Sequence, residues 1–215
     1  MAAIGEQRPP GPLELCEERG FRYAVFISWT HESNPWTSEI VSKIARALDE
    51  SFRNYIRGSQ ARVFLDSQRL EAGYRWDRQI RLSACRSAVT IAILIPTYFD
   101  SEYCKIEWGI AAALEALRVP AGTSQTCIIP LQLVQSDELI APDQVKAVQF
   151  RKEFEDLLVW GRDVETHPDW RNLINRLRRS VFDHISSICL TTRDWQREEQ
   201  IALTVGPFPF SWSPA

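Results

Sequence analysis

The stretch SEYCKIEW, residues 101–108, contains the side chain whose type and position most directly suggest chemistry. Glu107 falls one turn into a predicted helix, which Ser101 is placed to cap, at the margin of that helix's apolar face. A carboxylate there is either a solvated surface charge, paired with Lys105 or Arg118, or the working group of a ligand site. Charged residues at the margin of amphipathic helices are common, so spacing alone leaves both interpretations open.

The position of this helix in the chain bears on that choice. It follows the apolar run SAVTIAILIP, residues 87–96, which we predict to be a strand buried on both faces. Open parallel α/β sheets bind ligands in the crevice outside the carboxyl ends of their strands. Glu107, one turn beyond such an end, is expected to point toward that crevice.

Several familiar kinds of site are excluded because their motifs are missing from the sequence. It contains no GxxxxGK[ST], GxGxxG, HExxH or GxSxG pattern, which removes the P-loop, dinucleotide-fingerprint, zincin and serine-hydrolase interpretations. The histidines His31, His167 and His184 lie far apart, and only His31 follows a predicted strand end. The five cysteines never take a CxxC spacing, so we expect neither a metal site nor a disulfide framework.

Composition narrows the class of protein and its partners. The 215 residues are 45% hydrophobic and 25% charged, which is typical of a globular domain. A formal net charge of -3 supplies no basic field for holding nucleic acid or an anionic membrane, so we expect neither as a partner. The longest apolar run is far shorter than the ~20 residues of a membrane span, and no signal peptide is indicated. We expect a cytoplasmic protein.

Apolar runs alternate with helical patterns along the chain, as in an α/β fold with a parallel sheet. We predict strands at 23–29, 61–66, 87–96 and 126–133, with a fifth within 145–150. Apolar residues repeating every four positions predict a helix after the first strand, and a long apolar stripe behind Pro168 predicts another. The expected architecture is a five-stranded, mostly parallel sheet with helices on both faces and the first strand near its centre.

The ends of the chain differ in composition from its middle. Residues 1–20 are rich in Pro, Gly and Glu and are expected to form a flexible leader, followed by one domain at 21–190. The C-terminal tail, 191–215, ends in VGPFPFSWSPA, whose prolines and aromatics we expect to pack on their own domain rather than on a partner. Trp108, predicted on the outer side of its helix, would be covered by this tail or by a neighbouring subunit.

Four ordered motifs together resemble a Toll/interleukin-1 receptor (TIR) domain of the bacterial kind. They are FRYAVFISW at 21–29, FLD at 64–66 with the gap to Gly73, SAVTIAILIPTYFDS at 87–101, and SEYCKIEW. The resemblance runs from about residue 23 to 133, with weaker support through the helix ending near 185. It implies a flavodoxin-like α/β fold.

The resemblance also implies an activity for Glu107. Enzymatic TIR domains cleave NAD+ between nicotinamide and ribose, using a glutamate within an S-x-W-C-x-x-E pattern. Ser101, Tyr103, Cys104 and Glu107 occupy those places here, so Glu107 matches the catalytic position. Tyr103 replaces the usual tryptophan and keeps a smaller aromatic face for stacking on nicotinamide.

Further site residues follow from the same resemblance. The segment 66–73 matches the family's BB loop, which borders the substrate site, with Asp66 and Arg69 expected there, and which mediates TIR–TIR contacts. Ser28 and Trp29, at the end of the first strand, match residues that line the pocket. NAD+ is expected as the substrate, with no other cofactor.

Three functions are compatible with the sequence. The first is an NAD+ glycohydrolase that serves as a bacterial antiphage defence or signalling effector, is activated by self-assembly, and acts with a partner protein from the same defence system. The second is a cyclase that converts NAD+ into a cyclic ADP-ribose messenger. The third is a non-enzymatic TIR scaffold that binds other TIR domains. The retained S-x-aromatic-C-x-x-E pattern favours the two enzymes.

Overall fold

A computed structural model describes residues 10–31, 35–53, 62–65, 75–120, 122–135, 139–146, 148 and 152–211. The side chains of residues 62, 75 and 76 lie outside this description. The elements, in chain order, are α1 (Pro12–Glu18), β1 (Tyr23–Ser28), α2 (Pro35–Arg53), β2 (Arg62–Leu65), α3 (Arg75–Cys85), β3 (Ser87–Leu94), η1 (Pro96–Phe99), α4 (Glu102–Arg118), β4 (Ile128–Gln132), α5 (Asp143–Lys146), η2 (Lys152–Phe154), α6 (Leu157–Trp160), η3 (Gly161–Thr166), α7 (Trp170–Ile188) and α8 (Trp195–Thr204).

The four strands form one parallel sheet in the order β2-β1-β3-β4. Strand β1 is therefore internal, as predicted, and Ile27 pairs with Ile91 of β3. The prediction of five strands is wrong for the described residues, where four are present. Val145, at the start of the segment expected to hold a fifth strand, lies in helix α5 instead, where its side chain is buried.

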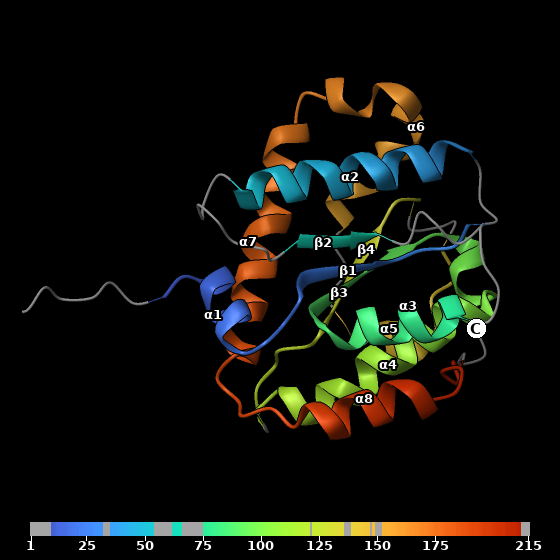
Figure 1. The fold of residues 1–215 in the computed structure, drawn as a ribbon. Helices are drawn as coiled ribbons and strands as arrows, with labels where there is room; N and C mark the ends of the chain where they lie inside the picture. The colour runs from blue at the N-terminus through green and yellow to red at the C-terminus, as the bar shows by residue number, and fades with distance from the viewer. Residues whose placement is uncertain are drawn as a thin grey trace, which may run out of the picture.

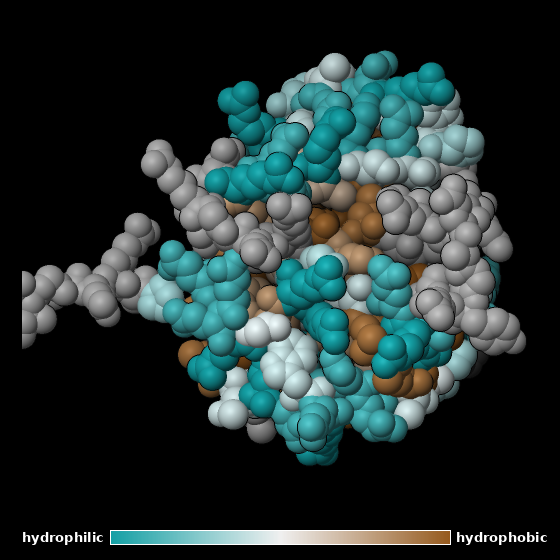
Figure 2. Space-filling model, in the orientation of Figure 1, coloured by the Kyte–Doolittle hydropathy of each residue, from teal (hydrophilic) through white to brown (hydrophobic). Residues whose placement is uncertain are grey.

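Helices cover both faces of the sheet, which explains why its two central strands, β1 and β3, are almost entirely buried (Figure 1). Helices α2 and α7 lie on one face, and α3, α4 and α8 lie on the other. Every residue of β3 is buried, because neither face of this strand meets solvent. The edge strand β2 is only half-buried where its side chains are described, and Figure 2 shows hydrophobic atoms between the layers of α2 and α3, where this strand crosses.

The predicted amphipathic helices are confirmed. Helix α2 buries the residues repeating every four positions, namely Ile40, Ile44, Leu48 and Phe52. Helix α7 likewise buries its apolar stripe, including Leu173, Leu177, Val181 and Ile185. Among the described residues no helix is both long and apolar enough to cross a membrane.

Both ends of the described chain pack more closely than composition indicated. Residues 12–18, expected to belong to a flexible leader, form helix α1, which buries Leu13 and Cys16 and contacts α7. Helix α8 lies within the segment expected to be a tail. Beyond it, residues 205–211 run along α4, where the Phe208 N–H donates a 3.0 Å hydrogen bond to the Lys105 carbonyl. The prediction that this segment packs on its own domain is confirmed.

Candidate functional site

Helix α4 begins where the sequence predicted. Ser101 is its N-cap, and the Ser101 hydroxyl accepts a hydrogen bond from the Cys104 N–H at 3.4 Å. Glu102, in the first turn, places a negative charge near the positive end of the helix dipole. Since η1 connects β3 directly to this cap, the first turns of α4 lie beside the carboxyl end of the sheet.

Glu107 lies in the interior of the protein, and only 1% of its surface is exposed. Ser28, the last residue of β1, donates a 2.6 Å hydrogen bond from its hydroxyl to Glu107 Oε2, and Ser28 is itself fully buried. The structure therefore brings together two of the predicted site residues at the carboxyl end of the internal strand. It also corrects the expectation that Glu107 sits at a partly solvated helix margin.

The surface-charge interpretation of Glu107 fails because its proposed partners pair elsewhere. The Lys105 ammonium lies 2.7 Å from the carboxylate of Glu102. The Arg118 guanidinium lies 2.7 Å from the carboxylate of Glu198. Glu107 instead contacts a buried hydroxyl, which is the environment of a functional or structural carboxylate rather than of a solvated one.

Tyr98 is the residue near this site that sequence reasoning missed. Its phenol oxygen lies 2.8 Å from the hydroxyl of Ser28, and its side chain is fully buried in η1. Because the Ser28 hydroxyl donates its one hydrogen to Glu107, the Tyr98 hydroxyl is the donor in this second contact. A chain of hydrogen bonds thus runs from Tyr98 through Ser28 to Glu107. The only signal in the sequence was the position of Tyr98 just after the end of the third strand.

Trp29 follows Ser28 and is also buried, with 4% of its surface exposed. Its ring centroid lies 4.1 Å from that of His31. The indole N–H of Trp29 is buried and has no hydrogen-bond acceptor among the residues that the structure describes. Buried donors without acceptors are uncommon in proteins, so this N–H is available to a ligand at the carboxyl edge of the sheet.

Of the predicted site residues still to be placed, the structure describes Tyr103 alone. Tyr103, one turn before Glu107, is 43% exposed, so its ring lies at the surface of α4 and not in the core. Asp66 and Arg69, together with the rest of the segment 66–73, lie outside the described residues.

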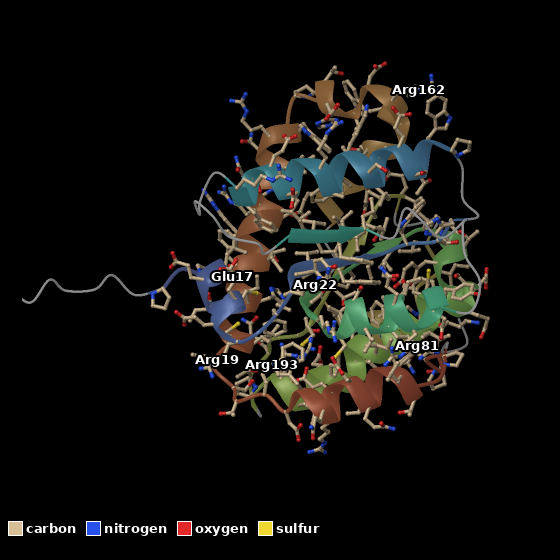
Figure 3. The ribbon with its side chains drawn as sticks, viewed as in Figure 1. Glu17, Arg19, Arg22, Arg81, Arg162 and Arg193 are labelled. Atoms are coloured by element: carbon tan, nitrogen blue, oxygen red, sulfur yellow. The ribbon has the colours of Figure 1, made fainter. Side chains whose placement is uncertain are left out.

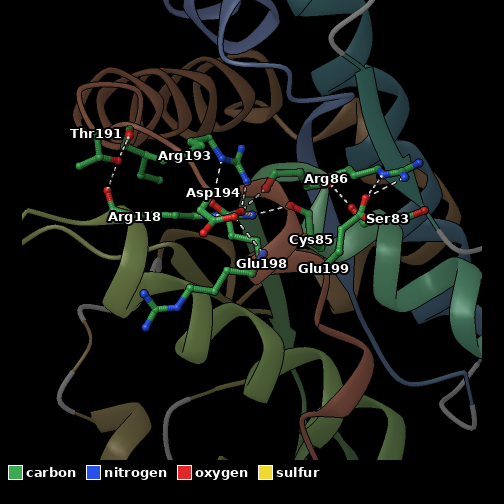
Figure 4. Close-up of polar contacts among 12 residues, drawn as sticks. Ser83, Cys85, Arg86, Arg118, Thr191, Arg193, Asp194, Glu198 and Glu199 are labelled. Carbon is green, nitrogen blue, oxygen red and sulfur yellow. Dashed lines mark hydrogen bonds and ion pairs between the residues drawn. The ribbon is translucent and has the colours of Figure 1, made fainter. Parts of the chain in front are cut away.

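A buried ion cluster holds the far end of α4 (Figure 4). It consists of Arg118, Arg193 and Glu198. Both guanidinium groups donate to the Glu198 carboxylate, Arg118 Nε at 3.1 Å and Arg193 Nε at 3.0 Å. Arg118 Nη1 also donates to the Ser87 carbonyl at 2.9 Å. The cluster therefore ties α4 to α8 and to the start of β3.

The last described segment of the chain covers the outer side of α4. Trp108 is only 3% exposed, and its ring centroid lies 5.6 Å from that of Phe210. Phe210 also packs against Phe99 at 5.2 Å. A Cβ added at Gly109 would lie 3.0 Å from the Gly206 carbonyl oxygen, so the absence of a side chain allows this close approach. The sequence left open whether the tail or a neighbouring subunit covers Trp108, and in the structure the tail covers it.

A comparison with known protein families matches residues 25–159 to a family described as TIR domain. The match covers more than half of the chain. The chain belongs to the TIR domain family. The match runs from β1 into α6 and contains Ser28, Tyr98 and Glu107. A search of curated proteins found no match.

Membership of the TIR family agrees with the observed architecture. A parallel sheet of four strands flanked by helices is consistent with the TIR fold, and it confirms the α/β class expected from the sequence. TIR domains support signalling and commonly associate with one another. The hydrogen-bonded chain from Tyr98 to Glu107 is thus the candidate active site of a TIR domain.

Proposed function

We propose that this TIR protein cleaves NAD+ at the bond between nicotinamide and ribose, with Glu107 as the catalytic residue. The observation that carries the proposal is the buried Glu107 carboxylate, which Ser28 holds at the carboxyl end of β1. Carboxylates are seldom buried unless they are paired or functional. This one also occupies the glutamate position of the S-x-aromatic-C-x-x-E pattern of NAD+-cleaving TIR domains.

The reaction suits a single carboxylate. When the glycosidic bond breaks, its electron pair passes to the pyridinium nitrogen, so nicotinamide leaves as a neutral molecule and needs no strong acid. The ribose becomes oxocarbenium-like, and the negative charge of Glu107 stabilises this positive charge and holds the ribose hydroxyls. Water then attacks the anomeric carbon and releases a proton, giving ADP-ribose, or an adenine nitrogen attacks it and gives a cyclic isomer.

Other groups near the site support substrate binding. The indole N–H of Trp29 is a buried donor next to Ser28 and is suited to a polar group of the substrate. The exposed ring of Tyr103 offers an aromatic face one turn from Glu107 for nicotinamide stacking. Asp66 and Arg69 of the BB-like segment 66–73 complete the proposed binding residues.

We also propose that self-association activates the enzyme through TIR–TIR contacts of the segment 66–73. The role would be that of a bacterial antiphage defence or signalling effector in the cytoplasm, acting with a partner protein of the same system. NAD+ is its substrate, and neither a further cofactor, nucleic acid nor a membrane takes part.

One experiment tests both NAD+ cleavage and its activation by self-association. The purified full chain is incubated with NAD+ at several protein concentrations, with and without a crowding agent, and the products are identified by mass. Nicotinamide with ADP-ribose indicates hydrolysis, and nicotinamide with a cyclic isomer indicates cyclisation. Turnover per molecule is expected to rise with concentration, and a flat value would contradict control by assembly. If no condition yields nicotinamide, the protein is a non-enzymatic scaffold.

A further inference from the structure

A hollow lies at the opposite end of the sheet from Glu107. It has a volume of about 530 Å³ and is lined by residues from the start of β1 and from α3 with the turn after it, namely Arg22, Tyr23, Arg78, Gln79, Leu82, Ser83 and Arg86. Arg22 precedes β1, whereas Ser28 ends it, so this hollow is separate from the candidate active site. Figure 3 labels Arg22 between β1 and α3.

The lining residues of α3 form one face of the helix. Arg78, Leu82 and Arg86 are spaced four residues apart, so they stack along successive turns and place the two arginines about 12 Å apart along the helix axis. Arg22, the residue before β1, lies beside Arg86, the residue after α3, because the N–H groups of Arg22 and Tyr23 donate to the Arg86 carbonyl at 2.9 and 3.2 Å. Arg22, Arg78 and Arg86 therefore border one hollow.

The charge of this hollow is not balanced by the protein. Arg86 pairs with Glu199 at 2.8 Å, as Figure 4 shows. Asp77, the acidic residue of α3, is paired with Arg81. Arg22 lies over the ring of Tyr23 at 5.4 Å, and in the described part of the chain neither it nor Arg78 lies within ion-pair distance of a carboxylate.

Three cations thus face one paired anion in a chain whose net charge is -3. Hydrophilic side chains are visible over this region in Figure 2. Like charges held close together repel one another, and a bound anion would offset that repulsion.

We propose that this hollow binds a soluble small molecule that carries more than one phosphate. Guanidinium groups donate pairs of hydrogen bonds in a planar fork that matches phosphate oxygens. Two unpaired guanidinium groups, with a third at the far end of the same helix face, suit a diphosphate better than a single phosphate. Gln79 supplies a further amide donor at the rim. The inference stands independently of NAD+ cleavage, since it uses none of the residues around Glu107.

The test is calorimetric titration of the full chain with inorganic pyrophosphate. Wild-type protein is expected to bind pyrophosphate more tightly than phosphate. Arg22→Gln and Arg78→Gln should each weaken binding by about tenfold or more, because each removes one charged donor. Arg179→Gln is the matched control, since Arg179 is an exposed arginine on α7, and it should leave binding unchanged.

Three outcomes would overturn the proposal. The first is no heat of binding with millimolar pyrophosphate. The second is an equal loss in Arg179→Gln, which would reveal a general charge effect. The third is binding to phosphatidylglycerol vesicles without binding to pyrophosphate, which would assign the arginines to a lipid surface. Glu107→Gln should still bind pyrophosphate, which separates this site from the candidate active site, and circular dichroism checks that every variant folds.

Discussion

The hydroxyl of Ser28 donates a 2.6 Å hydrogen bond to the carboxylate of Glu107, joining the last residue of β1 to the second turn of α4 across 79 positions of sequence. Its length is in the range of hydroxyl–carboxylate hydrogen bonds, and both groups are buried. As a result, the orientation of Glu107 depends on the central strand as well as on the helix that carries it.

Glu107→Gln keeps the shape of the side chain and removes its charge. NAD+ cleavage should fall by roughly 10² to 10³, the scale seen when a preorganised electrostatic group is lost. Because Glu107 is buried and hydrogen-bonded, the variant should also lose about 1 to 3 kcal/mol of unfolding free energy. Both quantities are measured on one preparation, by nicotinamide release and by urea unfolding. Glu102→Gln, which changes an exposed glutamate in the first turn of the same helix, should leave cleavage unchanged and cost less than about 1 kcal/mol. A cleavage rate in Glu107→Gln equal to wild type would remove Glu107 from the mechanism.

Ser28→Ala and Tyr98→Phe separate the two hydrogen bonds of the chain. Ser28→Ala removes the donor to Glu107, so kcat should fall by about tenfold or more. Tyr98→Phe keeps the ring and removes the hydroxyl that contacts Ser28, one step further from Glu107, so it should lower kcat less. Steady-state kinetics with NAD+ gives kcat and KM for each variant. A larger loss in Tyr98→Phe than in Ser28→Ala would contradict this order.

Tyr103 offers a test of substrate stacking with little effect on folding, since the side chain is 43% exposed. Tyr103→Ala should raise the KM for NAD+ and leave the unfolding free energy within about 0.5 kcal/mol of wild type. Tyr103→Trp restores the residue of the family pattern and should lower KM or leave it unchanged. If Tyr103→Ala changes kcat but not KM, the ring has a role other than binding.

Buried cysteines make the stability sensitive to high pH. Burial raises the pKa of Cys127 to about 12 and that of Cys85 to about 11, both from an ordinary value of 9.0. A raised folded-state pKa stabilises the fold fully below pH 9 and progressively less as pH rises from 9 to 12. Urea unfolding at pH 8 and pH 10.5 should therefore show a loss of stability, and Cys127→Ala should lessen that loss. An identical loss in the variant would assign the effect to other groups.

Two adjacent glutamates on α8 should differ sharply in their effect on stability. Glu198→Gln leaves the guanidinium groups of Arg118 and Arg193 buried without their carboxylate, so it should cost about 3 to 5 kcal/mol. Glu199→Gln breaks an ion pair with Arg86 whose two side chains are 35% and 39% exposed, so it should cost less than about 1 kcal/mol. Urea unfolding of both variants checks the difference. Similar costs would show that burial does not set the strength of these pairs.

Local pattern was sufficient to predict much of the fold. The largely apolar run of β3 indicates a strand that is buried on both faces, and the four-residue apolar repeat of α2 indicates a helix that is buried on one face. Both elements lie where the sequence predicted them. Helix α1 was missed because prolines and charges dominate residues 1–20. Pro12 in fact occupies the first turn of the helix, where its missing N–H costs nothing, and Leu13 and Cys16 are the residues that the helix buries.

The sequence predicted where the residues of the candidate site lie along the chain, but not the hydrogen bonds that join them. The motif located Glu107 on its helix and Ser28 at its strand end. The bond between them depends on how α4 packs against β1, which no local spacing reports. The same holds for Tyr98, whose role depends on a side chain 70 residues away.

The packing of α8 and residues 205–211 against α4 bears on how the protein should be produced. The family match ends at residue 159, but α4 is held by Glu198 and Trp108 is covered by Phe210. A recombinant fragment trimmed to the matched region would keep Glu107, yet it would leave Arg118 without its carboxylate and expose the ring of Trp108. An expression boundary that preserves the native packing of the helix carrying Glu107 therefore lies at or beyond residue 211.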